Sequence, residues 1–181
     1  MLRYIRYKTM QQRLARISMI VCDVDGVLTD GRLIVTDRGY ELKHFHSKDG
    51  FAVHFGKTIG LSFGIITARS TEAVQIRFKK QLKLDEVHDG VKDKGRAFQE
   101  LCARRKLTPE QVAYAGDELI DLPAMHRAGV SFAPRDAAAE VRRAASWVTS
   151  VDGGRGVLRE IVMLIARAQG RYHEAVQAYR G

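Results

Sequence analysis

Two carboxylates, Asp23 and Asp25, stand one residue apart directly after an apolar run over residues 17–22, and Gly26 follows them. The length of the run and the glycine that ends it favour a buried parallel strand. Alternate residues of a strand share a face, so both carboxylates are expected at the strand's carboxyl end, where open parallel sheets bind ligands. Their mutual repulsion indicates a cation or proton between them. The pair therefore predicts a cation site with one nucleophilic and one acid–base carboxylate; a solvated acidic turn is the alternative.

Two further predicted strands end in side chains that suit the same chemistry. Thr67 follows an apolar run over residues 61–66 and precedes a helix, where a hydroxyl either caps the helix or holds a phosphate oxygen. Lys94 begins the helix after a short strand over residues 83–88. A lysine in a first turn opposes the helix dipole, which indicates a function there. Lys92 is the rival for that role, and an incidental surface lysine is the alternative.

Three more acids, Asp117, Glu118 and Asp121, follow a strand over residues 112–116. Strands alternate with helices along the chain, which predicts an α/β fold: a doubly wound (Rossmann-like), mostly parallel sheet with helices on both faces. In that fold the strand ends meet at one edge, and so many carboxylates there call for a divalent cation. Oxygen ligands favour Mg²⁺. Carboxylates, a hydroxyl, a lysine and Mg²⁺ are together the parts for phosphoryl transfer through an aspartyl-phosphate.

The motifs Asp23-x-Asp-Gly-Val-x-Thr, Thr67, Lys94 and Gly116-Asp117-x-x-x-Asp121 resemble those of the haloacid dehalogenase superfamily of phosphatases. Longer strings are similar to the 3-deoxy-D-manno-octulosonate 8-phosphate (KDO 8-phosphate) phosphatases within it: DVDGVLTDG, YELKHF, KDGFAV, IITARS, VAYAGDELIDLPAM, GGRGVLREI and AQGRYHEA. The similarity covers about residues 17–178. It implies a Mg²⁺-dependent phosphatase of lipopolysaccharide precursor biosynthesis, with no separate cap domain. It also implies a homotetramer with packed hairpins, in which a neighbouring subunit helps to close each site.

The resemblance assigns a role to each motif residue. Asp23 is implied to be the nucleophile and a Mg²⁺ ligand, and Asp25 the general acid–base, with its main-chain carbonyl as a second ligand. Asp117 is implied to be the third protein ligand. Thr67 and Lys94 would hold the transferring phosphoryl oxygens. The substrate-binding positions carried over are Gly26, Lys48, Asp49, Gly50, Ala68, Arg69 and Arg77, some of them acting from the adjacent subunit.

Several positions depart from the family pattern. Glu118 and Ala68 replace a usual Asp and Gly, and His46, His54 and Asp89 replace a usual Asn, Arg and Gln. These changes leave the four catalytic functions intact but bear on sugar specificity. Arg69 favours the carboxylate-bearing octulosonate, since similar phosphatases of nine-carbon sugar acids tend to carry Glu there.

The length of 181 residues predicts one domain, with residues 1–16 as a basic N-terminal arm or short helix, 32–45 as a β-hairpin insert and 170–181 as a polar C-terminal tail. The Gly-Gly-Arg-Gly loop at residues 153–156 is either a linker or an anion site. His44 and His46 have no third ligand nearby, which favours ordinary histidines over a metal pair.

The composition bears on the partners. Without an 18-residue apolar run or a separate signal sequence, no membrane segment is expected. Two distant cysteines, Cys22 and Cys102, fit a reduced, cytoplasmic protein. The net charge is +9, yet the basic residues are spread without interleaved aromatics, so a small anionic substrate is expected and nucleic acid is not. Two alternatives stay open: the same chemistry on another sugar-acid phosphate of the nonulosonate 9-phosphate type, or a catalytically silent binding or oligomerisation module.

Overall fold

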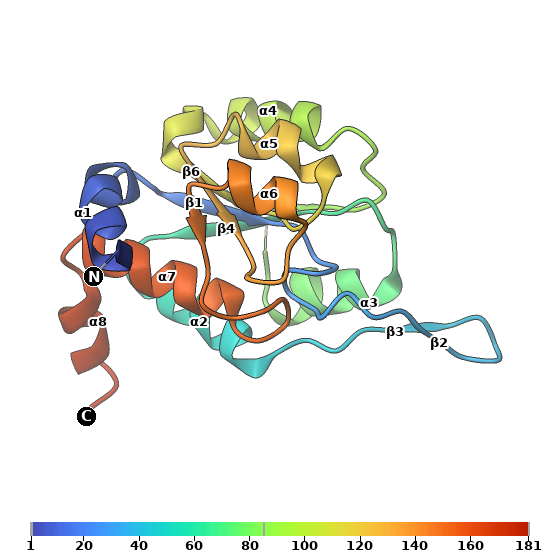
Figure 1. Cartoon of the computed structure of the whole chain (residues 1–181). Helices are drawn as coiled ribbons and strands as arrows, with labels where there is room; N and C mark the ends of the chain where they lie inside the picture. Colours follow the sequence, from blue (N-terminus) through green and yellow to red (C-terminus); the bar gives the residue numbers. More distant parts are fainter. Residues whose placement is uncertain (1, 85, 181) are drawn as a thin grey trace.

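The computed structural model describes residues 2–84 and 86–180, and within them six strands form a parallel sheet in the order β5-β4-β1-β6-β7-β8 (Figure 1). This confirms the predicted doubly wound α/β fold. Met1, Asp85 and Gly181, which the sequence placed in the arm, the third strand and the tail, lie outside the described residues. The strands are β1 (Met19–Cys22), β4 (Ser62–Ile66), β5 (Glu86–His88), β6 (Val112–Ala115), β7 (Val130–Ala133) and β8 (Trp147–Val148).

Helices cover both faces of this sheet, as Figure 1 shows with α4 and α5 on one side and α2 and α7 on the other. Alternation along the buried strands divides the core between the faces: Ile20 and Cys22 belong to one cluster, Met19 and Val21 to the other. The helices of the first cluster include α1 (Leu2–Ala15), α2 (Ser47–Thr58), α7 (Val157–Ala168) and α8 (Tyr172–Gln177). Those of the second are α4 (Lys94–Arg105), α5 (Leu122–Met125) and α6 (Ala139–Ala144). None of the described helices combines the length and apolarity needed to cross a bilayer.

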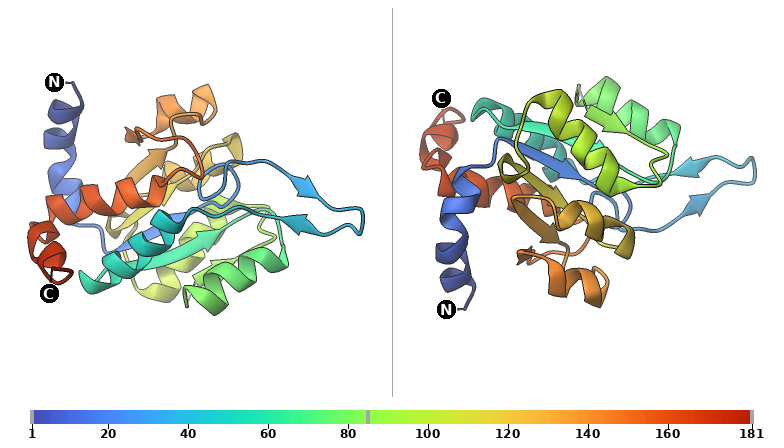
Figure 2. Two further views of the ribbon diagram at one scale, coloured as in Figure 1. Left: turned by 90° about the horizontal axis from the view of Figure 1, so that it is seen from below. Right: turned by 90° about the horizontal axis from the view of Figure 1, so that it is seen from above.

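The predicted hairpin is present between β1 and α2. Strands β2 (Ile34–Val35) and β3 (Glu41–Leu42) pair antiparallel, and Gly39 takes a φ of +78° in their turn. The hairpin extends away from the body of the molecule (Figure 2). Its apolar side chains are exposed, from 41% for Ile34 to 67% for Tyr40, with Leu33, Val35 and Leu42 between these values. A two-stranded hairpin with so much exposed apolar surface is marginal alone.

Both ends of the described chain pack on the core. Met10 and Leu14 of α1 are buried, and the Arg6 and Arg13 guanidinium groups donate to the main-chain oxygens of Ala145 and Gly129. Residues 2–15 are therefore a docked helix rather than a solvated arm. The helical pattern breaks at Gly170 as expected, but the stretch expected as a polar tail contains α8, which packs against the core.

The helix expected after Thr67 is irregular. A short α-helix, α3 (Glu72–Val74), continues as a π-helix, η1 (Gln75–Gln81), in which the Leu82 amide donates to the Arg77 carbonyl five residues earlier. The sequence predicted an ordinary helix here. The wider turn accompanies burial of both Phe78 and Leu82 against the core. Arg77, one of the carried-over substrate residues, lies within this π-helical turn.

Two single-turn 3₁₀ helices complete the chain, at Pro109–Gln111 (η2) and Leu119–Asp121 (η3). The first begins with a capping box formed by Thr108 and Gln111. The second directly follows Asp117, so it fixes the path of the acidic loop after β6. This placement brings Asp121 back over the carboxyl end of the sheet.

Candidate active site

Asp23 leaves the carboxyl end of the central strand β1 and is held from several sides. Its amide donates to the Ala115 carbonyl of β6 over 2.9 Å, its Oδ1 accepts from the Val24 amide over 2.7 Å, and its Oδ2 lies 2.7 Å from Lys94 Nζ. The side chain is only 7% exposed. A carboxylate fixed in this way at a sheet edge has the orientation that a nucleophile needs.

Lys94 is buried in the first turn of α4, where the Asp93 side chain caps the helix by accepting from the Arg96 amide. Its ammonium lies 2.7 Å from both Asp23 Oδ2 and Asp121 Oδ1. Burial lowers the pKa of Lys94, but the two carboxylates outweigh burial and raise it above its usual range. Lys94 therefore stays charged at the sheet edge, whereas its rival Lys92 is exposed.

Asp121 organises this edge, although no separate role was predicted for it. Its Oδ1 accepts from Lys94 and from the Tyr114 hydroxyl, and its Oδ2 accepts from the amides of Asp117 and Glu118. All four bonds are between 2.7 and 3.2 Å. With both oxygens occupied, Asp121 acts as a support for Lys94 and for the loop that carries Asp117. Its position four residues after Asp117 was the signal in the sequence.

Carboxylate oxygens of Asp23, Asp117 and Asp121 lie within 4.8 Å of one another. Burial, and then the neighbouring carboxylates, raise the pKa of Asp23 to about 6 and that of Asp117 to about 8. Asp117 Oδ1 is buried without a hydrogen-bond partner within the described chain. An unpaired buried carboxylate oxygen beside repelling neighbours fits a hard divalent cation such as Mg²⁺. Because Asp121 is already saturated, Asp23 and Asp117 are the carboxylates with capacity for it.

Gly26 makes this crowding possible. It has a φ of +84°, and a Cβ built there would lie 2.0 Å from Asp117 Oδ2. Any side chain would therefore push the acidic loop away from the β1 end, and the positive φ adds backbone strain for other residues. The resemblance implies that Gly26 binds substrate, and the acidic cluster also requires a glycine at this position because it leaves no room for a side chain.

Thr67 ends β4 as predicted and is buried beside the same edge. Its amide donates to the His88 carbonyl, its carbonyl accepts from the Val91 amide, and its hydroxyl oxygen accepts from the Arg69 amide over 3.4 Å. Thr67 lines an open cleft of about 240 Å³; the other lining residues are Asp23, Asp25, Gly26, Gly31, Ala68, Arg69, Asp117, Glu118 and Ile120. The structure therefore brings together most of the predicted catalytic, metal and phosphate-binding positions.

Lys43 joins this site from the hairpin, and the sequence reasoning missed it. Its ammonium donates to Asp25 Oδ1 and to Glu41 Oε1, and the Arg69 guanidinium donates to Glu41 Oε2. The hydrogen bond from Arg69, and then that from Lys43, holds the pKa of Glu41 below its usual range. Glu41 lies in β3 and Lys43 directly follows the strand, so these alternate positions of the extended chain share one face. That alternation was the available signal.

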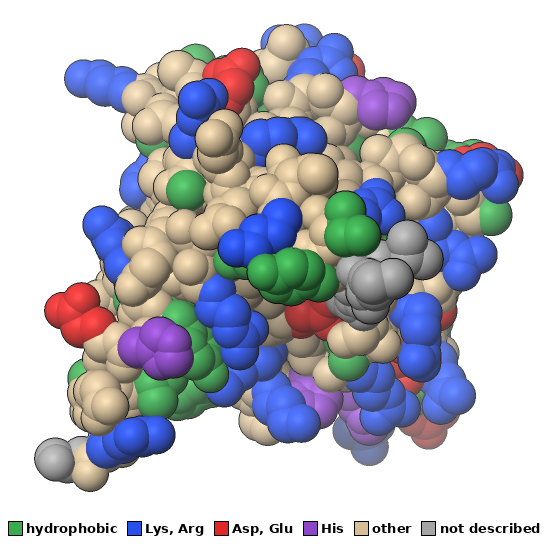
Figure 3. All heavy atoms as spheres, turned by 60° about the vertical axis from the view of Figure 1, so that its left-hand side comes forward, with side chains coloured by type: hydrophobic (Ala, Val, Ile, Leu, Met, Phe, Trp, Pro, Cys, Tyr) green, Lys and Arg blue, Asp and Glu red, His purple; other side chains and the backbone are tan. Residues whose placement is uncertain are grey.

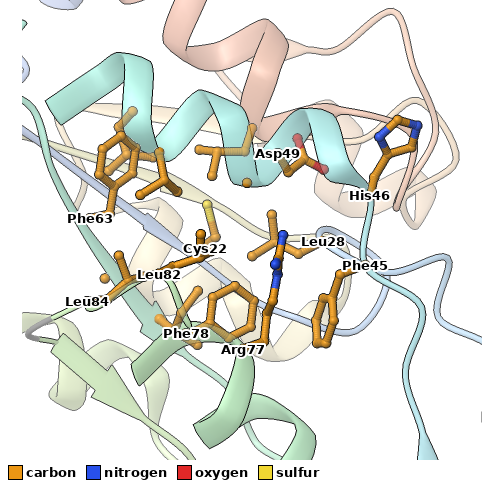
Figure 4. A pocket seen from close by; sticks show the side chains of 16 residues that line it. Cys22, Leu28, Phe45, His46, Asp49, Phe63, Arg77, Phe78, Leu82 and Leu84 are labelled. Atoms are coloured by element: carbon orange, nitrogen blue, oxygen red, sulfur yellow. The ribbon is translucent and has the colours of Figure 1, made fainter. Parts of the chain in front are cut away.

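Four of the carried-over substrate residues, Lys48, Asp49, Gly50 and Arg77, do not line the cleft at Asp23. Asp49, Gly50 and Arg77 line a separate, largely apolar cavity under α2, in which Arg77 reaches from η1 toward α2 (Figure 4). A Cβ on Gly50 would lie 2.5 Å from Arg77 Nη2, so the glycine makes room for the guanidinium. Lys48 lies on the surface groove beside the start of α7.

Asp49 has a structural task in this arrangement. Its Oδ1 accepts from the Arg159 amide in the first turn of α7 over 3.0 Å. Burial raises the pKa of Asp49 to about 6, against the effect of these main-chain donors. The side chain therefore caps one helix from another and points away from the cleft at Asp23.

The positions that depart from the family pattern fall into local roles. Glu118 caps η3 by accepting from the Leu119 amide, and His46 caps α2 through Nδ1, which accepts from the Lys48 amide. Asp89 accepts from the Ser70 hydroxyl. Ala68 lines the cleft, and His54 is exposed on α2. Of these five, Ala68 and Glu118 are the ones that border the cleft.

The Gly-Gly-Arg-Gly loop packs beneath the site. The Gly154 amide donates to the Val27 carbonyl and the Gly153 amide to Asp136 Oδ1, each over 2.9 Å. A Cβ on Gly153 would lie 2.0 Å from the Gly26 carbonyl oxygen. Two of the amides offered as an anion site are therefore already used, and the loop supports the backbone that follows Asp25.

Residues 72–161 match the model of the haloacid dehalogenase-like hydrolases. The 3-deoxy-D-manno-octulosonate 8-phosphate phosphatase KdsC of Yersinia pestis is 40% identical over 91% of this chain and 87% of its own length. KdsC of Escherichia coli K12 is 38% identical over 88% and 84%.

The chain belongs to the KDO 8-phosphate phosphatase family of haloacid dehalogenase-like hydrolases.

Solved structures agree with that membership. The Y. pestis phosphatase superposes with a TM-score of 0.88 at 39% identity, covering 91% of this chain and 88% of that one. The Moraxella catarrhalis KDO 8-phosphate phosphatase, solved with magnesium, phosphate and KDO, gives 0.91 at 31% identity, with 95% and 98% covered. The haloacid dehalogenase fold and magnesium as the metal are thus established for this chain, and the described carboxylates of Asp23, Asp117 and Asp121 form a group close enough together to hold such an ion.

Proposed function

We propose that this chain is a Mg²⁺-dependent phosphatase that hydrolyses KDO 8-phosphate to KDO and phosphate, a step of lipopolysaccharide precursor biosynthesis. The observation that carries the proposal is the buried Asp23–Lys94 pair at the end of β1, with Asp25 and Asp117 beside it. Relatives of similar length bear that activity in their names. The Arg69 fork at the cleft suits the carboxylate of the sugar acid.

The chain's own residues supply the steps of an aspartyl-phosphate mechanism. Asp23 attacks phosphorus in line, and Asp25 gives its proton to the leaving sugar oxygen. Asp25 then takes a proton from the water that hydrolyses the aspartyl-phosphate. Lys94 and the Thr67 hydroxyl hold the phosphoryl oxygens during both steps. The pairing of Lys94 with Asp121 keeps its ammonium directed at Asp23.

Asp23, Asp117 and the main-chain carbonyl of Asp25 would hold the metal ion. Mg²⁺ when bound there supplies positive charge against the phosphoryl oxygens. It also removes the repulsion that raises the pKa values of Asp23 and Asp117.

Phosphate release from KDO 8-phosphate tests the proposal, beside a nonulosonate 9-phosphate and simple sugar phosphates. We expect turnover with Mg²⁺, loss with EDTA, and a loss of at least about 10³-fold in Asp23→Asn, because an amide cannot act as the nucleophile. Activity in Asp23→Asn would exclude the covalent mechanism. Preference for the nonulosonate 9-phosphate would change the assigned substrate but not the mechanism. Inactivity on every phosphate would favour a binding module.

We also infer a homotetramer built through the hairpins. The exposed apolar residues of β2 and β3 support it. So does the separation of Lys48 from the cleft at Asp23, because that lysine can then serve a neighbour's cleft. Two buried, unpaired thiols, Cys22 and Cys102, support placement in the cytoplasm.

A further inference from the structure

Lys43 is a buried cation that the mechanism above does not use. Its side chain is 2% exposed, and its ammonium contacts two carboxylates, Asp25 Oδ1 and, over 2.8 Å, Glu41 Oε1. Burial of a lysine costs hydration and side-chain entropy, and the cost is tolerated where the ammonium is paired with carboxylates. Two partners on one ammonium therefore indicate a requirement for a fixed position at Asp25.

The contacts continue as a chain of alternating charges from the site to the hairpin. Asp25 bonds to Lys43, Lys43 to Glu41, and Glu41 to Arg69. The exposed fraction of the Asp25 side chain is 20% and that of Glu41 is 14%, whereas Arg69 is 46% exposed at the cleft. The less exposed members are thus tied together, and the most exposed member, Arg69, stands at the end of the series.

The two oxygens of Asp25 are left in different states by this contact. Oδ1 is occupied by Lys43, whereas Oδ2 is buried and has no hydrogen-bond partner among the described residues. Asp25 itself lines the cleft with Asp23 and Thr67. An oxygen without a partner beside the reacting groups is the one free to hold and transfer a proton.

We propose that Lys43 is a positioning residue for Asp25: by holding Oδ1, it presents Oδ2 to the leaving oxygen of the substrate. When the P–O bond breaks, its electron pair goes to the sugar oxygen, which takes the proton from Oδ2 while the O–H bond of Asp25 breaks. Lys43 neither gains nor loses a proton. This inference rests on the proposed function and adds a residue to it from outside the four motifs.

The test uses the different needs of two leaving groups. A sugar alkoxide must be protonated as it leaves, whereas p-nitrophenolate leaves unprotonated. In Lys43→Met we expect the rate of the first turnover on KDO 8-phosphate to fall about 10²-fold, the lower range for loss of general acid catalysis. The first-turnover release of p-nitrophenolate from its phosphate should change less than about twofold. KM for KDO 8-phosphate should change little.

Two controls separate positioning from stability. Lys57→Met removes another lysine, whose ammonium donates to the main-chain oxygens of Leu82 and Lys83, and it should leave the ratio of the two rates unchanged. Lys43→Arg keeps a donor at Asp25, so it should restore part of the rate lost on KDO 8-phosphate relative to the rate on the aryl phosphate. Equal losses on both substrates, or no loss on either, would overturn the proposal.

The proposed function fails separately. If the wild-type chain does not cleave KDO 8-phosphate, its substrate assignment is wrong. The test of Lys43 then compares the first-turnover rate on mannose 6-phosphate, or on another alkyl phosphate that the chain cleaves, with the rate on the aryl phosphate. A wild-type chain that cleaves only the aryl phosphate has no general acid to position, which also overturns the role of Lys43.

Discussion

Asp121 shows how one buried side chain sets the geometry of several others. It accepts four hydrogen bonds, two at each oxygen, and two of the donors are amides of the loop that bears Asp117. The residue types of the site followed from the sequence because strand ends converge in a parallel sheet. The separate roles of its carboxylates could not be predicted, because they depend on which carboxylate oxygens already accept hydrogen bonds.

The raised pKa values predict how the metal-free chain responds to pH. Folding raises the pKa of Asp23 and Asp49 to about 6 and that of Asp117 to about 8, each from an ordinary value of 3.8. The folded chain therefore binds more protons than the unfolded chain between these values, and stability should fall as the pH rises from about 4 to about 8. Thermal unfolding in EDTA across this pH range measures the change in stability.

Mg²⁺ should reverse part of that fall, because it replaces the protons of the acidic cluster. The increase in Tm on adding Mg²⁺ is expected to grow between pH 5 and about 8. Ca²⁺-free buffers of constant ionic strength are the control. A metal-induced shift that is the same at every pH would contradict a metal site at Asp117.

At the scale of elements, Asp49 links the first turn of α7 to α2. In Asp49→Ala the α7 amide loses its acceptor, and we expect the free energy of unfolding to fall by about 1–2 kcal/mol. Asp49→Asn keeps an acceptor oxygen and removes a buried charge, so its loss should be smaller. Urea unfolding at pH 8 compares the two variants.

A different result would restore the role suggested by the family pattern. If both variants were as stable as the wild type but had a higher KM, Asp49 would contact substrate rather than cap α7. The sequence could not choose between these roles. Asp49 follows a helix start in the chain, and its partner amide at Arg159 is 110 residues away.

The π-helical turn is the element that pattern reading missed. Periodicity predicted a helix there, but a single extra residue per turn leaves the same apolar residues buried, so the hydrophobic pattern does not reveal it. The positions of β1, β4 and β6 were predictable because each is a short apolar run, and the hairpin was predictable because its turn contains Gly39. Lys43 was not predictable as part of the site, since its contact with Asp25 needs the hairpin's folded path.

At the scale of the whole molecule, charge and apolar surface have different distributions. On the side that carries α1 and α8, Lys and Arg side chains are scattered rather than gathered into a strip (Figure 3). A continuous basic groove is what nucleic-acid binders usually present. The largest exposed apolar side chains, by contrast, include a set that lies together on the hairpin.

That set predicts the effect of a charge on β3. Leu42 is 49% exposed between Glu41 and Lys43, so it points away from their shared face. Leu42→Glu should weaken association between copies by at least about tenfold, because a charge would be buried in an apolar contact. Light scattering after size exclusion measures the mass, and activity on KDO 8-phosphate should fall with it.

Tyr4→Glu, on an exposed apolar residue of α1, is the matched control and should keep the mass of the wild type. A Leu42→Glu chain of unchanged mass would rule out the hairpin as the contact between copies. Unchanged circular dichroism in both variants shows that the fold is retained.

The loop at residues 153–156 has three glycines in four residues, a composition usually associated with rapid local motion. Its Gly154 amide is nevertheless bonded to Val27, and Gly153 fits against the Gly26 carbonyl with no room for a Cβ. The Gly154 amide proton should therefore exchange with solvent as slowly as those of the core strands. Because glycine has no side chain, the segment before α7 packs directly against the backbone of residues 26–30, and it holds in place the turn that follows Asp25.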